Sequence, residues 1–254
     1  MKKILFGSRI FTPELIIFDK DGTLVDFEST WVPLLDMRVQ QILDRLGAGF
    51  QKKTMKEELY SSIGVSANSI DPRGPFPQTS TAEDEVIAAA VLYRHGIPWQ
   101  RAKKIVRESM IEAEKALDRP KYAKLLPGTR ETLSSLHNHG IRLAVATADL
   151  TGITNAILKR LDIDGLFDIV LGADSVQRDK PDTEMIETAV SSIGATPERV
   201  AFVGDTVNDM EMGRQSGIGL VVGVLEGGVT PREYLEELAD LVIDSVRDIR
   251  AAGR

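Results

Sequence analysis

Short apolar runs, separated by helical stretches, are the feature of this sequence that most limits how the chain can fold. Each run is aliphatic or aromatic without polar alternation, which is typical of parallel strands covered on both faces. Five runs are clear and the last is a sixth candidate: 15–18, 143–146, 169–171, 200–203, 218–222 and 241–243. Helices are predicted around the later runs, at 129–137, 151–161, 183–193 and 233–238. The alternation predicts an α/β fold with a Rossmann-like parallel sheet and right-handed crossovers.

A long segment without a convincing strand interrupts this alternation after the first run. Three helices are predicted in it, at 31–46, 86–93 and 98–117. Ser80 and Glu83 have the spacing of a capping box at the start of the second of these helices. The segment 71–77 is too rich in proline for a helix or a strand and is predicted to be a loop.

These patterns predict two domains. Residues 1–25 and 126–254 form the α/β core, and residues 26–125 form an all-helical domain inserted between the first two core strands.

Composition excludes several classes of protein. The 254 residues carry a formal net charge of −7, which argues against nucleic acid as a partner because phosphate backbones need clustered Lys and Arg. The absence of cysteine excludes disulfides and thiolate metal sites, and it suits a reducing cytoplasm. No apolar run approaches the roughly 20 residues of a membrane-spanning helix. Residues 1–11 lack the apolar core and cleavage site of a signal peptide. We therefore expect a cytoplasmic protein with no membrane partner.

Two aspartates follow the first predicted strand, in the stretch Phe18-Asp19-Lys20-Asp21-Gly22-Thr23. Residues two apart in an extended segment point to the same face, so Asp19 and Asp21 are expected to face one site. Two carboxylates about 4 Å apart repel by roughly 4 kcal/mol at an effective dielectric near 20. A turn would need only one of them, so the pair favours a functional site. Lys20, between them, is expected to point to the opposite face and to have no catalytic role.

Other polar residues follow later strands. Asp205 and Asp209 come after the strand at 200–203, Thr147 follows the strand at 143–146, and Lys180 lies in the loop after the next strand. Taken singly, each fits a turn, a helix cap or a solvated surface equally well. Together they would meet at the carboxyl edge of a parallel sheet, where such folds bind ligands. An oxygen-rich site without Cys or His predicts Mg²⁺ and a phosphate-bearing substrate.

These motifs, in this order, resemble those of the haloacid dehalogenase superfamily, in particular its phosphoglycolate-phosphatase-like hydrolases. The likeness covers essentially the whole chain, including the helical cap domain inserted after the first core strand. It rests most firmly on the Asp19 motif, Asp-x-Asp-Gly-Thr, and on Gly204-Asp205 with Asp209.

The resemblance implies a Mg²⁺-dependent phosphatase acting on a small phosphorylated metabolite. In it Asp19 would be the nucleophile that forms an aspartyl-phosphate, and Asp21 the general acid and base. Thr147 and Lys180 would bind the phosphoryl group. The metal would be held by Asp19, Asp21 through its backbone carbonyl, and Asp205. Asp209 would hold a metal-bound water or position Lys180.

Alternatives to this phosphatase remain open at this point. A sugar phosphomutase would keep the same motifs, whereas dehalogenases and phosphonate hydrolases of the superfamily usually lack the second aspartate, which here is Asp21. A phospho-accepting regulatory module is about half as long and has no such insert. A catalytically inactive binding protein would be expected to lack a core motif residue.

Overall fold

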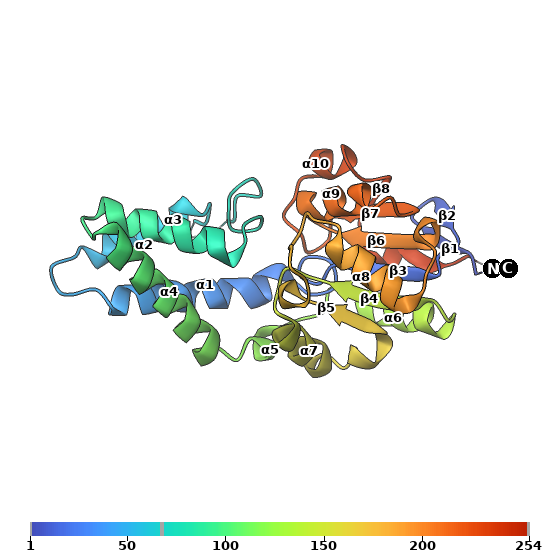
Figure 1. Ribbon diagram of the computed structural model, residues 1–254, viewed down its shortest axis with the longest axis horizontal. Coiled ribbons are helices and arrows are strands. Elements are labelled where there is room, and N and C mark those ends of the chain that lie inside the picture. The colour runs from blue at the N-terminus through green and yellow to red at the C-terminus, as the bar shows by residue number, and fades with distance from the viewer. Residues whose placement is uncertain (1, 67–68, 253–254) are drawn as a thin grey trace. The chain divides into compact units, whose positions relative to one another are not determined.

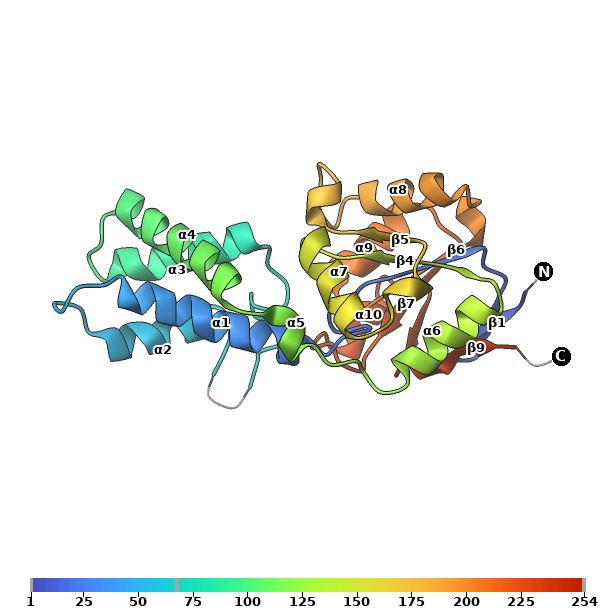
Figure 2. The same ribbon diagram turned by 90° about the horizontal axis from the view of Figure 1, so that it is seen from below.

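The computed structural model describes residues 2–66 and 69–252, and its chain divides into two compact units (Figures 1 and 2). One unit comprises Met1–Phe27 and Ala123–Arg254, and the other comprises Glu28–Tyr122. We describe each unit by itself.

The first unit is built on a six-stranded parallel sheet, as the apolar runs predict. Its strand order is β5-β4-β3-β6-β7-β8, with β3 in the middle. The strands are β3 (Leu15–Phe18), β4 (Arg142–Ala146), β5 (Ile169–Leu171), β6 (Val200–Gly204), β7 (Leu220–Val224) and β8 (Leu241–Ile243). Each of the six predicted runs is a strand, displaced by at most two residues at either end.

Helices cover both faces of this sheet, which gives the unit three layers (Figure 2). Strand side chains alternate between two buried clusters, so Ile16 and Phe18 belong to one and Leu15 and Ile17 to the other. Helices α6 (Thr129–Asn138) and α7 (Thr151–Arg160) contribute to the first cluster. Helices α8 (Glu184–Ile193), α9 (Val207–Gln215) and α10 (Arg232–Glu236) contribute to the second. The fold class predicted from sequence is confirmed.

A small antiparallel sheet, which the sequence patterns did not predict, joins the two ends of the chain. Its order is β2-β1-β9, formed by β1 (Ile4–Phe6), β2 (Arg9–Phe11) and β9 (Ile249–Ala251). Three-residue strands are too short for a periodic pattern, and β1 and β9 are paired over more than 240 positions of sequence. Ile4, Phe6 and Ile249 are buried in the cluster that also contains the α6 side chains.

In the second unit, the elements of the described residues are all helices, apart from an isolated antiparallel bridge between Val65 and Ile70. Its elements are α1 (Phe27–Asp44), α2 (Lys52–Ser62), α3 (Thr81–Arg94), α4 (Trp99–Ala116) and α5 (Arg119–Tyr122). The Ser80–Glu83 capping box is present at the start of α3, and the segment 71–77 contains no helix or strand. Helix α2 went unpredicted because its sequence is strongly polar and buries only Met55 and Leu59. Among the described residues, no helix is both long and apolar enough to cross a lipid bilayer.

The two chain segments that lead to and from the helical unit pair with each other inside the first unit. Asp26 N donates to Lys124 O at 2.9 Å, and Leu126 N donates to Leu24 O at 3.0 Å. Val25 and Leu125 form the antiparallel bridge between these two hydrogen bonds. The insert therefore leaves and re-enters the core at one place, next to the loop that follows β3.

The buried surface of α6 provides a test of this packing. Leu133 is fully buried in the cluster beneath the sheet, so Leu133→Ala should lower the free energy of unfolding by about 2–5 kcal/mol. Leu150→Ala, the same substitution at an exposed position, should change it by about 0.5 kcal/mol or less. Urea unfolding followed by far-UV circular dichroism measures both. Equal effects of the two substitutions would contradict the core assignment.

Candidate active site

The register of the central strands brings three predicted site residues to one edge of the sheet. Phe18 at the end of β3 pairs with Val145 of β4 on one side and with Val203 of β6 on the other. One or two residues beyond these partners lie Asp19, Thr147 and Asp205. All three are buried. The candidate site thus lies where the middle strand and its two neighbours end.

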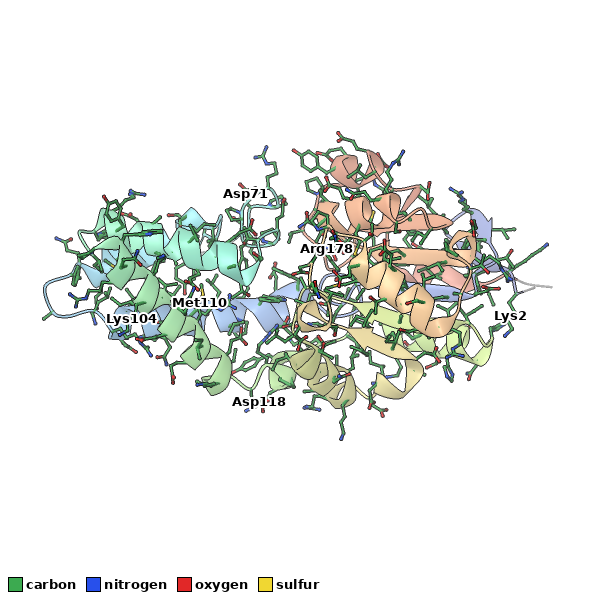
Figure 3. The ribbon with its side chains drawn as sticks, in the orientation of Figure 1. Lys2, Asp71, Lys104, Met110, Asp118 and Arg178 are labelled. Carbon is green, nitrogen blue, oxygen red and sulfur yellow. The ribbon has the colours of Figure 1, made fainter. Side chains whose placement is uncertain are left out.

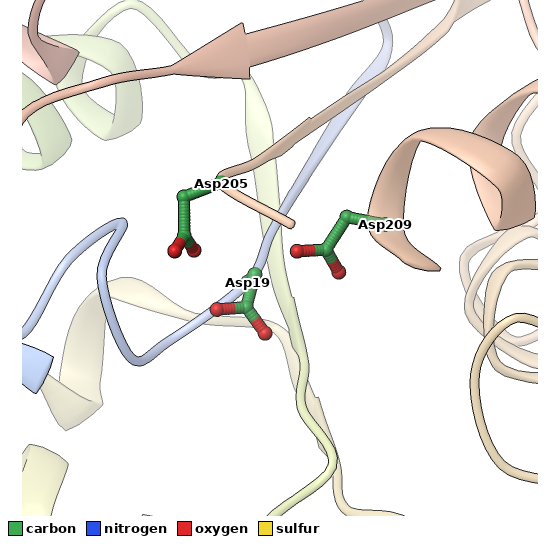
Figure 4. Close-up of side chains that lie close together, drawn as sticks. All are labelled: Asp19, Asp205 and Asp209. Carbon is green, nitrogen blue, oxygen red and sulfur yellow. The ribbon is translucent and has the colours of Figure 1, made fainter. Parts of the chain in front are cut away.

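Three carboxylates converge there (Figure 4). Asp19, Asp205 and Asp209 each offer an oxygen within 4.8 Å of the others. Burial raises the pKa of Asp19 to about 7, against the attraction of Lys180 and with a further contribution from the charge of Asp209. Burial also raises the pKa of Asp205 well above its usual value, and the neighbouring charges of Asp19 and Asp209 add to this. The fold therefore concentrates negative charge that it does not itself fully compensate.

Lys180 supplies part of the missing positive charge from the loop between β5 and α8. Its Nζ lies 2.5 Å from Asp19 Oδ1 and 2.7 Å from Asp209 Oδ1, and it sits 5.7 Å from the ring centre of Phe202. Burial lowers the pKa of this ammonium, but the charges of Asp19 and Asp209 outweigh burial and raise it. Lys180 is therefore a buried, charged group in direct contact with Asp19.

The loop that carries Lys180 is held to the start of α8 by an arginine. Arg178, labelled in Figure 3, forms ion pairs with Asp182 and Glu184, each at 3.3 Å. Glu184 also accepts hydrogen bonds from the backbone N–H groups of Gln177 and Arg178. These contacts fix the loop on both sides of Lys180.

Asp209 is held at the first turn of α9 by a capping box with Thr206. Its Oδ2 accepts hydrogen bonds from Thr206 N and Oγ1, while its own N–H donates to Thr206 Oγ1. Its Oδ1 accepts from Lys180. Both oxygens thus have protein donors, which suits a residue that positions Lys180.

Thr147 follows the end of β4, as predicted. Its hydroxyl accepts a hydrogen bond from a residue of the same loop. Thr147 Oγ1 accepts from Asp149 N at 3.2 Å, and Thr147 N donates to Leu171 O at 3.0 Å. The hydroxyl is therefore held at the sheet edge by its own loop. Thr147 is not the N-cap of α7, because that helix begins four residues later, after Leu150.

The predicted direction of the Lys20 side chain is wrong. Its side chain is fully buried, and its Nζ lies 2.6 Å from Asp21 Oδ2 and 3.0 Å from Asp149 Oδ2. Side-chain alternation holds only along an extended strand, and β3 ends at Phe18. At Lys20 the chain already turns, because its carbonyl accepts from the N–H groups of both Leu24 and Val25. The ammonium therefore reaches the same edge as the aspartates.

Small residues around Asp205 are a second feature that sequence reasoning missed. A Cβ on Gly22 would lie 2.3 Å from Asp205 Oδ2, and a Cβ on Gly228 would lie 2.6 Å from the same atom. Thr23 donates to Asp205 Oδ1 at 3.0 Å. Gly22 belongs to the Asp-x-Asp-Gly-Thr motif, whereas Gly228 lies in the loop after β7 and shows no signal before the fold is known. Glycine is required at both positions, because a side chain at either one would displace the Asp205 carboxylate.

Comparisons with known proteins agree with the motifs. The model of the haloacid dehalogenase-like hydrolase family matches residues 13–217. A phosphoglycolate phosphatase of Caulobacter vibrioides is 38% identical, and the match covers 93% of this chain and 89% of that protein. A probable phosphatase of Dickeya dadantii, IndB, is 30% identical over 94% of this chain and 93% of its own length. The crystal structure of a predicted phosphoglycolate phosphatase from Haemophilus somnus matches with a TM-score of 0.69 at 23% identity, covering 93% and 96% of the two chains. The family resemblance is confirmed.

The raised pKa of Asp19 predicts a pH-dependent stability in metal-free protein. A carboxyl whose pKa rises from 3.8 unfolded to about 7 folded binds its proton more tightly when folded, so its contribution to the free energy of unfolding falls as pH rises across that interval. Asp19→Asn removes this loss. The variant should therefore unfold at a higher temperature than the wild type, by a margin that widens between about pH 5 and about pH 7.

Scanning calorimetry in the presence of a chelator measures the effect. Asp164→Asn, at an exposed position, is the matched control. The difference between its unfolding temperature and that of the wild type should not widen between about pH 5 and about pH 7. A constant margin for Asp19→Asn as well would contradict the burial of an ionised Asp19.

Proposed function

Because this chain belongs to the haloacid dehalogenase-like hydrolases and is a phosphatase of that family, we propose that it hydrolyses a small phosphomonoester through an aspartyl-phosphate formed on Asp19. The observation that carries the proposal is the direct contact between Lys180 and Asp19 at the edge where the buried carboxylates converge. An ammonium in contact with a nucleophilic carboxylate provides a place for an incoming phosphoryl oxygen.

The donor set fits a magnesium ion. Asp19 and Asp205 are buried oxygen ligands, and Gly22 and Gly228 leave no side chain against the Asp205 carboxylate. Two carboxylates, with water and substrate oxygens, are a usual magnesium environment. We propose Asp19, Asp205 and the backbone carbonyl of Asp21 as ligands, with Asp209 positioning Lys180. When bound, the ion would neutralise the crowded carboxylates and polarise the phosphoryl oxygens.

The chain's own residues account for both chemical steps. In the first, an Asp19 oxygen bonds to phosphorus, the ester P–O bond breaks, and Asp21 gives its proton to the departing oxygen. In the second, Asp21 takes a proton from water as the water oxygen bonds to phosphorus and the Asp19–phosphorus bond breaks, which releases inorganic phosphate. Lys180 and Thr147 are assigned to the phosphoryl oxygens in both steps.

Residues 28–122 are proposed to act as the cap of this hydrolase. Support comes from their place in the chain, since the insert follows the Asp19 loop directly and re-enters beside it. The substrate we propose is a small, soluble phosphorylated metabolite of the cytoplasm, and phosphoglycolate is the first to test because of the named relatives.

A panel of phosphomonoesters tests the proposed activity. We expect phosphate release that requires Mg²⁺, and Asp19→Asn should reduce kcat by about 10⁴-fold or more because no acyl-phosphate can form. The panel contains phosphoglycolate, sugar phosphates, nucleotides and 4-nitrophenyl phosphate.

The control is Asp164→Asn, an exposed carboxylate that should keep the wild-type rate. Folded protein that releases no phosphate from any ester would refute the proposal. Transfer of phosphate between hydroxyls of one sugar, without net release, would instead identify a phosphomutase.

A further inference from the structure

A buried ammonium beside the proposed general acid is not used by the mechanism above. The Lys20 side chain has no exposed surface, whereas 6% of the Lys180 side chain is exposed. Removing an ammonium from water costs several kcal/mol unless charged partners compensate. Its partners here are two carboxylates, Asp21 and Asp149. The burial of a charged lysine at this place therefore suggests a role beyond packing.

The backbone gives Lys20 little freedom to move. Asp19 N donates to Val203 O at 2.8 Å, and the carbonyl of Lys20 accepts two N–H groups from Leu24 and Val25, both at 2.9 Å. The loop after β3 is therefore anchored on both sides of Lys20. From this anchored backbone, the side chain extends to place its Nζ 2.6 Å from Asp21 Oδ2.

The other partner, Asp149, is held just as firmly from a different strand. Its Oδ1 accepts from Leu150 N at 2.9 Å, its carbonyl accepts from Ala173 N at 3.0 Å, and its N–H donates to Thr147 Oγ1. Its Oδ2 accepts from Lys20. Lys20 thus joins the loop of Asp19 and Asp21 to the loop of Thr147.

From this geometry we infer that Lys20 is a positioning residue, which holds Asp21 in one orientation for proton transfer to and from the reacting oxygen. The inference rests on the proposed function. Lys20 donates to Asp21 Oδ2 at 2.6 Å, and this charge-assisted hydrogen bond restricts the rotation of the Asp21 carboxyl group. The Asp21 side chain is 11% exposed and that of Lys20 is not exposed, so Asp21 is the member of this ion pair that solvent can reach.

A purely structural ion pair predicts a different outcome. If Lys20 only stabilised the fold, its loss would slow the hydrolysis of every ester by the same factor. A misplaced general acid instead harms esters in proportion to the basicity of the leaving group, because a basic alkoxide or phenoxide needs the proton and 4-nitrophenoxide departs without it.

The experiment compares aryl phosphates that differ only in the basicity of the leaving group. Lys20→Met and the wild type are assayed with Mg²⁺ on 4-nitrophenyl, phenyl and 4-methoxyphenyl phosphate, and kcat/KM is plotted against leaving-group basicity. We expect the variant to lose about tenfold or more on the two basic leaving groups beyond its loss on 4-nitrophenyl phosphate, within the roughly 10²–10⁴-fold that general acid catalysis contributes. Lys20→Arg should recover part of the loss.

Two further variants keep the test decisive. Lys20→Met/Asp149→Asn removes both charges of the Lys20–Asp149 pair, so Asp149 is not left as an uncompensated buried carboxylate. This double variant should show the same steep dependence on leaving-group basicity. Lys159→Met, at an exposed position of α7, is the matched control and should behave as the wild type.

The outcomes separate this inference from the proposed function. A folded wild-type enzyme without activity on these aryl phosphates and on every member of the phosphomonoester panel would refute the phosphatase proposal itself. An active wild type with equal losses on all three esters in the Lys20 variants, or with no loss, would overturn the positioning role alone.

Discussion

Repulsion between buried carboxylates is the constraint on which the arrangement of this site depends. Asp19, Asp205 and Asp209 lie within 4.8 Å of one another, and burial raises the pKa of Asp19 and of Asp205. The fold tolerates this because Lys180 contacts two of the three directly. The loops after β3 and β6 bring Asp19 and Asp205 to the sheet edge, and the loop before α8 fixes Lys180, the cation that balances Asp19 and Asp209.

The balance is shared between two lysines that reach different carboxylates. Lys180 serves Asp19 and Asp209, whereas Lys20 serves Asp21 and Asp149. The residues proposed as nucleophile and as acid therefore have separate counter-ions, carried by separate loops. This separation allows the charge on one to change during a reaction without drawing away the cation that holds the other.

The sheet and the main site residues could be predicted from sequence because each depends on a local pattern. A strand buried on both faces is continuously apolar, and the residues that follow such strands must meet at one edge. Asp19, Thr147 and Asp205 were placed at that edge by this reasoning, and the structure places them there. For Lys180 the pattern is less direct, since a loop separates this residue from its strand.

Features that depend on distant partners could not be predicted. The pairing of β1 with β9 needs both chain ends at once, and Gly228 matters only because the loop after β7 passes Asp205. Lys20 was misjudged because strand alternation was extended past Phe18, where the backbone turns. Its partner Asp149 gives no local signal, since the contact joins positions 129 residues apart.

The hydrogen-bonded pairing of Leu24–Asp26 with Lys124–Leu126 has a consequence for how such a chain can change. The ends of the insert are already held together by the core, so the loop-closure entropy of the intervening residues depends only weakly on their number. The register of β3 and β4 is set by pairing within the core, so we expect it to persist when the helical unit is lengthened or replaced. The sequence of the helical unit can therefore vary without disturbing the core residues that form the candidate site.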